Sequence, residues 1–327
     1  MRTILSNKAA TGLLTLLSPF ILLKTLILAN PAEAAMKKPV TFERDNQTLV
    51  GTLYLPDDYQ QGSKLPGVVV TGAWTTVKEQ MPTTYAIELA NRGYAALVFD
   101  FRGWGQSSDA IQYLEDPVRK TEDINAAVNY LITRPEIDAT NIAGLGICAS
   151  AGYMSDAAAS NPHIKSLALV APWLHNADIV DAVYGGEEGV NKLINAARAA
   201  KSSDTPVYLE AASLENENAV MYQAPYYTEK DRGLIPEYDN RFNVASWEGW
   251  LTYDALKTAD IMEKPALLVH SEAAAIPQGA KEYQRRAGDN VTLIMLDDVT
   301  QFDFYDQQEP VNTAINAVVE HFNQSLQ

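Results

Sequence analysis

This sequence has very little cysteine and no long cluster of basic residues. Cys148 is the single cysteine in 327 residues, so no disulfide can form within the chain. No basic run is longer than the pair Lys37-Lys38, and the formal net charge is −16 with an isoelectric point near 4.6. Nucleic acids and anionic membrane surfaces attract positive patches, so this balance argues against both as partners. Internal repeats and low-complexity linkers are also absent from the sequence.

The first 34 residues have the pattern of a secretory signal peptide. A positively charged start is followed by an apolar core over residues 9–23 and by the small-x-small cleavage site Ala32-Glu33-Ala34. We therefore expect a signal peptide over residues 1–34 and a secreted or periplasmic mature protein that does not contact the membrane. The alternative is an uncleaved membrane anchor over residues 9–29, because the apolar character continues beyond the predicted core.

From Val68 onward, short apolar runs alternate with helical patterns. This alternation is typical of an α/β fold with a parallel sheet that helices cover on both faces. A period-two pattern on either side of Asp45-Asn46 adds an antiparallel hairpin before it. The length allows one large domain of this kind or two small ones. The apolar runs lie at 67–71, 95–100, 142–147, 166–171, 265–270 and 292–296, and helical patterns lie at 83–92, 122–133, 153–160, 278–286 and 311–322.

The stretch NIAGLGICASAGY, residues 141–153, is the segment around which the chain is organised. A short buried strand turns sharply through small residues into a helical pattern. Such a turn strains the backbone of its central residue and needs small neighbours, because the strand and helix backbones nearly touch. With Gly146 as the first small residue, Cys148 falls at the centre of the turn, where a nucleophile would stand above the sheet. The alternative is a buried, unreactive cysteine beside a helix start.

The same stretch, GICAS followed by GY, together with GYAALVFDFRGWGQS at 93–107, resembles the α/β-hydrolase superfamily. With TTVKEQM upstream, it is similar to the branch near the dienelactone hydrolases and polyketide-transferase-like proteins, and the former also use a cysteine nucleophile. The resemblance covers about residues 38–325. It implies a mostly parallel eight-stranded sheet in one domain, residues 35–327, with a helical cap over about residues 174–260 inserted after the sixth strand.

The resemblance also assigns the donors of an oxyanion hole, which acyl transfer needs beside its nucleophile. One donor is the amide of Ala149, the residue after the nucleophile. The other is the amide of Ala73 or Trp74, in the loop after the third strand. Gly72 begins this loop and permits close approach of the backbone, or else serves only as a turn residue.

The partners that activate such a nucleophile are absent from their usual positions. After the last strand the superfamily reads Leu-x-x-x-Gly-His, and here Gln301 stands on the His position. A glutamine forms hydrogen bonds but cannot take a proton near neutral pH. After the seventh strand, where the superfamily has Asp, this chain has the alanines of residues 273–275. Both triad partners of Cys148 are therefore predicted to be replaced.

Three residues are candidates to replace them. His175 lies just past the sixth strand, beside the strand that carries Cys148, and is the candidate base, with packing against the cap as the alternative. Glu79, in the loop with the oxyanion donors, and Glu272, near the acid position, are candidate supporting residues. The other histidines are expected in the core or at the surface.

Two functions remain open. The first, which the sequence favours because the turn, the cysteine and the oxyanion loop remain together, is a Cys148-dependent hydrolase or acyl transferase acting on an ester, thioester or lactone. A thiol can work with a poorer base than a hydroxyl. The second is a hydrolase-fold protein that has lost catalysis and binds a small apolar ligand. The many aromatics between Trp173 and Lys264 indicate a small-molecule substrate with an apolar part. No cofactor or metal is expected, and the pattern leaves the oligomeric state open.

Overall fold

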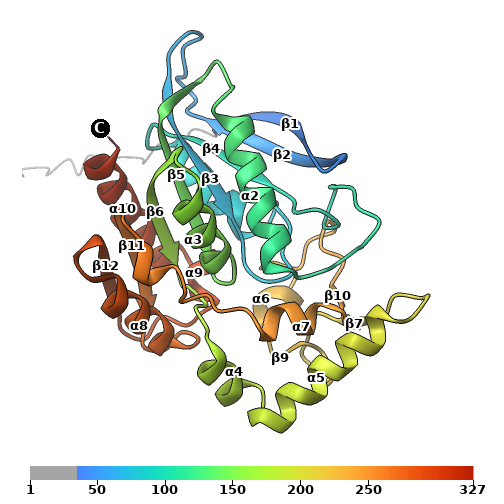
Figure 1. The fold of residues 1–327 in the computed structure, drawn as a ribbon. Helices are drawn as coiled ribbons and strands as arrows, with labels where there is room; N and C mark the ends of the chain where they lie inside the picture. The colour runs from blue at the N-terminus through green and yellow to red at the C-terminus, as the bar shows by residue number, and fades with distance from the viewer. Residues whose placement is uncertain (1–34, 327) are drawn as a thin grey trace, which may run out of the picture. The chain divides into compact units, whose positions relative to one another are not determined.

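The computed structural model describes residues 35–326, and at its centre is an eight-stranded sheet (Figure 1). In spatial order the strands are β1 (Met36–Arg44), β2 (Gln47–Leu55), β4 (Ala95–Phe99), β3 (Leu65–Thr71), β5 (Ile137–Ile147), β6 (Ile164–Val170), β11 (Ala266–Ser271) and β12 (Val291–Leu296). β2 pairs antiparallel with β1 and with β4, and every other neighbouring pair is parallel. The predicted α/β fold with a mostly parallel eight-stranded sheet is confirmed.

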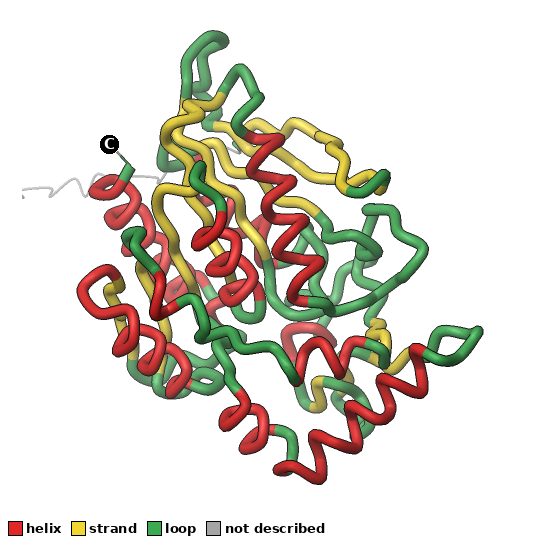
Figure 2. Tube along the Cα trace, in the orientation of Figure 1, coloured by secondary structure: helices red, strands yellow, loops and turns green. Residues whose placement is uncertain are grey.

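Helices cover both faces of the sheet (Figures 1 and 2). On one face α2 (Pro117–Leu131) packs against α3 (Ser150–Ser160), and α8 (Pro277–Ala287) reaches α3 through Tyr283 and Ser155. On the opposite face α1 (Met81–Ala90), α9 (Asp303–Asp306) and α10 (Gln308–Ser325) contact one another. Because water is excluded from both faces, β4 is buried along its whole length, which explains its continuous apolar run.

Helix α2 begins earlier than the apolar pattern alone predicts. The Asp116 side chain accepts hydrogen bonds from the amides of Val118 (3.0 Å) and Arg119 (3.1 Å) and caps the first turn. Pro117 occupies the first helical position, where its missing N–H leaves no hydrogen bond unmade. The cap therefore extends the helix five residues before its predicted start at Glu122.

Between β6 and β11 the chain forms the predicted cap. It contains α4 (Ala177–Val183), α5 (Gly186–Lys201), α6 (Pro225–Thr228), α7 (Ser246–Leu251) and η1 (Ala259–Ile261). Two short ribbons accompany them: β7 (Tyr208–Glu210) pairs with β10 (Arg241–Asn243), and β8 (Ala212–Ser213) pairs with β9 (Met221–Tyr222). The cap is thus less helical than expected, because loops and these ribbons occupy most of the segment between α5 and α7.

Aromatic side chains join the cap to the body. The Trp74 ring, in the loop after β3, lies 4.9 Å from Trp250, 5.0 Å from Phe242 and 5.7 Å from Trp247, measured between ring centroids. Contacts of this kind are favourable beyond the apolar area they bury. They hold α7 and β10 over the loop in which the sequence predicts an oxyanion donor.

Within residues 35–326, none of the helices is long and apolar enough to cross a membrane. The predicted signal peptide, residues 1–34, lies outside the described residues.

Candidate active-site cavity

Cys148 occupies the turn between β5 and α3, with a left-handed φ of 55°. Few non-glycine residues adopt this conformation, so the turn must be held from outside. The Cys148 amide donates to the carbonyl of Val170 (3.0 Å), and its own carbonyl accepts from the amide of Trp173 (3.0 Å). A Cβ added at Gly146 would lie 2.7 Å from the Ser150 carbonyl oxygen, so only glycine fits there. The turn therefore needs a small residue at this position because the strand and helix backbones nearly touch, as the sequence pattern predicts.

A cavity of about 470 Å³ opens above this turn. The body contributes residues that follow β3, β5, β6, β11 and β12, which places the cavity at the carboxyl edge of the sheet, the usual ligand-binding edge of open α/β sheets. The cap contributes the remaining lining residues. The lining residues are Trp74, Cys148, Ala149, Trp173, Val183, Tyr184, Val220, Met221, Tyr227, Trp250, Ala275, Gln301, Phe302 and Tyr305.

The thiol of Cys148 is protonated near neutral pH in this environment. Burial raises the pKa of Cys148, and the nearby Tyr305 hydroxyl, the amides of Trp74 and Ala149 and the Gln301 side chain only partly oppose that rise. The thiolate is the reactive form of cysteine, so burial keeps Cys148 in its less reactive state.

The loop after β3 supplies one of these amides. A Cβ on Gly72 would lie 2.6 Å from both Thr76 Oγ1 and Pro82 Cγ, so the loop requires glycine at its start. Ala73 does not line the cavity, and its carbonyl accepts from Thr76 Oγ1 at 2.7 Å. Of the two predicted donors in this loop, the structure brings Trp74 to the cysteine.

Glu115 fixes the next residue of this loop, Thr75, whose φ is 64°. The fully buried carboxylate of Glu115 accepts from the Thr75 amide (3.2 Å) and from the Tyr153 hydroxyl (2.8 Å). The buried Lys120 ammonium lies 2.8 Å from the same carboxylate. The Glu115 amide in turn donates to Ser246 Oγ in α7 (2.9 Å), so this one residue links the loop, α2, α3 and the cap.

Gln301 lies in the cavity wall, and both hydrogens and the oxygen of its side-chain amide have hydrogen-bond partners. Its Oε1 accepts from the Ala275 amide at 3.1 Å, and its Nε2 donates to the Ala171 carbonyl at 2.8 Å and to the Tyr305 hydroxyl at 3.0 Å. The contact with Ala275 places the predicted His position beside the predicted Asp position. Neither residue can accept a proton there.

His175 is packed behind the cavity wall. Its Nδ1 accepts from the Trp173 indole N–H and its Nε2 donates to the Trp250 carbonyl, each at 3.0 Å. Burial lowers the pKa of His175 to about 4, so the ring is neutral at pH 7. The structure does not bring this histidine into the cavity, and its position corresponds to the packing alternative.

The candidate acids are also placed elsewhere. Glu79 lies 2.6 Å from the buried ammonium of Lys78, which is itself paired with Asp100 at 2.7 Å. Glu272 forms an exposed ion pair with Lys281. Within residues 35–326, no His, Asp, Glu, Lys or Arg lines the cavity. No group of three or more potential metal ligands occurs among the described residues either.

Sequence reasoning missed Tyr305 and Glu115. Tyr305 lies in α9, four residues after Gln301, and no pattern in FDFYD distinguishes it from an ordinary core tyrosine. Glu115 adjoins the helix-capping Asp116, and only the tertiary fold shows that its carboxylate is fully buried.

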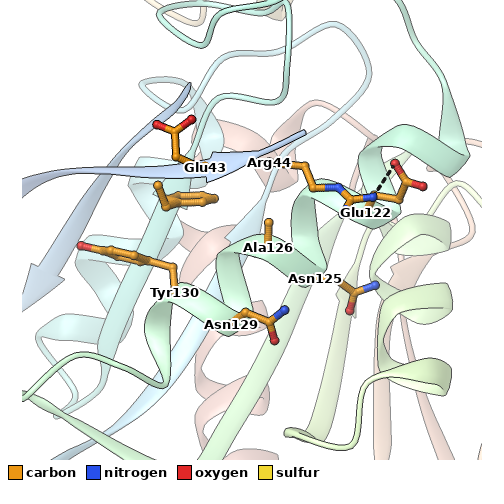
Figure 3. A pocket seen from close by; sticks show the side chains of 8 residues that line it. Glu43, Arg44, Glu122, Asn125, Ala126, Asn129 and Tyr130 are labelled. Atoms are coloured by element: carbon orange, nitrogen blue, oxygen red, sulfur yellow. Dashed lines mark ion pairs between the residues drawn. The ribbon is translucent and has the colours of Figure 1, made fainter. Parts of the chain in front are cut away.

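A second hollow lies between β1 and α2 (Figure 3). It is an open groove lined by Phe42, Tyr130 and several polar residues, with an ion pair between Arg44 and Glu122 (3.2 Å). It shares no residue with the cavity above Cys148 and contains no nucleophile, so it is not the candidate site.

Comparison with known proteins agrees with this fold. Residues 45–274 match the family model described as X-Pro dipeptidyl-peptidase (S15 family). The uncharacterized protein YcjY of Escherichia coli strain K12 is 27% identical over 307 residues, covering 89% of this chain and 100% of YcjY. The crystal structure of hypothetical protein PA2218 from Pseudomonas aeruginosa has a TM-score of 0.78 at 24% identity, covering 90% of this chain and 95% of that chain.

A thiohydrolase of Eupenicillium brefeldianum is 30% identical over 141 residues, which are 43% of this chain and 44% of that protein. The fold is that of the α/β-hydrolases, as the sequence resemblance implied, and the relatives include proteins named as hydrolases. The family match ends at residue 274 and so includes Cys148 but not Gln301.

Proposed function

The chain belongs to the X-Pro dipeptidyl-peptidase (S15) family, and on this hydrolase scaffold we propose that it binds a small, largely apolar ligand above Cys148 without rapid turnover. The observation that carries this proposal is Gln301. An amide with all its hydrogen-bonding groups occupied by Ala275, Ala171 and Tyr305 stands beside the cysteine. General-base catalysis needs a group that takes up a proton, and none lines the cavity within the described residues.

The cavity has the properties of a ligand site. Its volume of about 470 Å³ is in the range of small-molecule pockets. Half of its lining residues are aromatic, including Trp74, Trp173 and Trp250, and large flat side chains offer extensive apolar contact. Polar groups of Cys148, Gln301 and Tyr305 lie together in its wall. These features favour a ligand with a flat apolar body and one polar end.

A second candidate function is acyl transfer through Cys148, on an ester, thioester or lactone. It is favoured by the left-handed conformation of Cys148, which a merely packed cysteine would not need, and by the amides of Trp74 and Ala149 beside the sulfur. The sulfur would bond to the acyl carbon, and the thiol proton would leave with the departing alcohol or thiol. Without a base this step is slow and restricted to activated acyl compounds.

Binding is tested with the neutral fluorescent probe N-phenylnaphthylamine. Val220 lines the cavity, so Val220→Trp should fill part of it and weaken probe binding by about tenfold or more. Val118 is exposed on α2 and lines no part of the cavity, so Val118→Trp is the matched control and should bind like the wild type. Absence of saturable probe binding, or equal effects of the two variants, would contradict the proposal.

A further inference from the structure

The groups around the Cys148 sulfur are all hydrogen-bond donors. The amides of Trp74 and Ala149 and the Tyr305 hydroxyl each favour the thiolate and lower the pKa of Cys148, and all three residues line the cavity with it. An oxyanion hole accounts for the two amides. Tyr305 adds a side-chain donor that the hydrolase mechanism does not use, and Gln301 contacts its hydroxyl.

The hydrogen-bond chain fixes the direction of each donor. The Ala275 amide can only donate, so the group it meets at 3.1 Å is the oxygen of Gln301. The Ala171 carbonyl can only accept, so the nitrogen of Gln301 faces it at 2.8 Å. The same nitrogen donates to the Tyr305 oxygen at 3.0 Å. The hydroxyl hydrogen of Tyr305 is therefore left to point at Cys148, since its oxygen already serves as the acceptor.

No positively charged side chain accompanies these donors in the described part of the cavity wall. The chain as a whole carries a net charge of −16. A carboxylate would therefore lose its water without gaining a counter-ion. A ligand hydroxyl would bring a hydrogen-bond donor into the site. The acceptor nearest to it would be the Cys148 sulfur, which is a weak acceptor. A neutral carbonyl oxygen only accepts hydrogen bonds, so it is the ligand group that matches the donors around Cys148.

We propose that Tyr305, oriented by Gln301, selects ligands that present a neutral carbonyl oxygen to the donors around Cys148 while their apolar body lies against the aromatic walls. This inference rests on the proposed ligand-binding function and names the polar end of the ligand. Tyr305 lies at 1% relative exposure in α9, which keeps its hydroxyl in place before any ligand arrives. A preorganised donor gains more affinity than one that must be ordered on binding.

Four ligands with the same naphthyl body test this selection on the wild-type protein: methyl naphthyl ketone, the corresponding secondary alcohol, naphthoate and ethylnaphthalene. Each is measured by displacement of N-phenylnaphthylamine. We expect the ketone to bind about fivefold to tenfold more tightly than ethylnaphthalene, as one neutral hydrogen bond allows. The alcohol and naphthoate should bind no more tightly than the hydrocarbon. A ketone no better than ethylnaphthalene, or naphthoate as the tightest ligand, would overturn the inference.

The variant Tyr305→Phe assigns the effect to the hydroxyl. It should remove most of the ketone's advantage and leave ethylnaphthalene unchanged, whereas a merely structural role would weaken both ligands equally. Tyr222→Phe, at an exposed tyrosine outside the cavity wall, is the matched control. Saturable binding of ethylnaphthalene with no preference for the ketone contradicts this inference alone. Failure of all four ligands and of the probe contradicts the proposed function as well.

Discussion

Residue 301 shows how one side chain changes what a hydrolase site can do. An imidazole here would accept the thiol proton and return it, whereas the amide of Gln301 only donates and accepts hydrogen bonds. Its three partners, Ala275, Ala171 and Tyr305, make it part of the cavity wall. The same side chain orients the Tyr305 hydroxyl, so the replacement has a structural role of its own.

The first prediction concerns the protonation of Cys148. Because its pKa is raised by burial, the thiol stays protonated as pH rises through the ordinary range of a free cysteine. The rate of alkylation by iodoacetamide, followed against pH by mass spectrometry, should have its midpoint above that of a small-molecule thiol. Tyr305→Phe removes a hydrogen bond that lowers this pKa, so its midpoint should move higher still. A midpoint below that of the free thiol would mean that the thiolate is stabilised.

The second prediction concerns the missing base. Gln301→His places an imidazole beside Cys148, and general-base catalysis contributes a factor of about 100 to 10,000 in favourable geometry. Since the surroundings were built for an amide, we expect a smaller gain, about tenfold, in the hydrolysis of nitrophenyl esters. Adding Cys148→Ala should abolish the gain. A gain that persists without the cysteine would show that the imidazole acts directly on the ester and not through the thiol.

At the scale of elements, the Glu115–Lys120 pair holds four parts of the structure in register. Both side chains are buried, and the carboxylate receives hydrogen bonds from the Thr75 amide and the Tyr153 hydroxyl. The Lys120 ammonium also lies 4.6 Å from the Phe101 ring centroid and 4.7 Å from that of Trp104. Burial lowers the pKa of Lys120 while Glu115 opposes that change, so each charge depends on the other.

The third prediction tests this dependence. Lys120→Met leaves a buried carboxylate without its partner and should lower the free energy of unfolding by about 3 to 5 kcal/mol. Lys281→Met breaks the exposed pair with Glu272 and should change it by less than about 1 kcal/mol. Urea unfolding of both variants provides the comparison. Equal small effects would show that the buried pair does not stabilise the fold.

The sequence predicts the sheet and its helices well, because apolar runs and capping residues act locally. The strand run found at 142–147 lies within β5, and the run at 166–171 extends one residue beyond the end of β6. The small residues around Cys148 indicated the turn between β5 and α3. The cap is harder to predict. β7 pairs with β10 about thirty residues away, and neither strand is long enough to show a period.

The candidate site is predictable only where a motif specifies a position. Cys148, Ala149, Trp74 and Gln301 were found from their places relative to strands, and the structure brings all four to one cavity. His175, Glu79 and Glu272 were chosen for their chemistry near those places, and each has other partners. Sequence proximity does not reveal which way a side chain points. Tyr305 and Glu115 act through contacts across the fold, which leave no local pattern.

At the scale of the whole molecule, the fourth prediction is export. The pattern that motivates it is the charged start, apolar core and small-x-small site of residues 1–34, which lie outside the described residues. We propose that residues 1–34 are removed, so protein purified from its natural host should begin at or near Ala35 by amino-terminal sequencing. Intact Met1 on soluble protein from the cytoplasm would contradict this, and intact Met1 on membrane-bound protein would favour the anchor alternative.

We propose that the cavity holds a ligand, and within residues 35–326 no base lines it beside Cys148. The most direct test is the sustained release of nitrophenol from a nitrophenyl ester by the wild type and by Cys148→Ala, with enzyme and ester at known concentrations. We expect the two steady rates to agree within about twofold, with at most one nitrophenol released per Cys148 before the steady phase. Rapid multiple turnover by the wild type that is lost in Cys148→Ala would contradict the account.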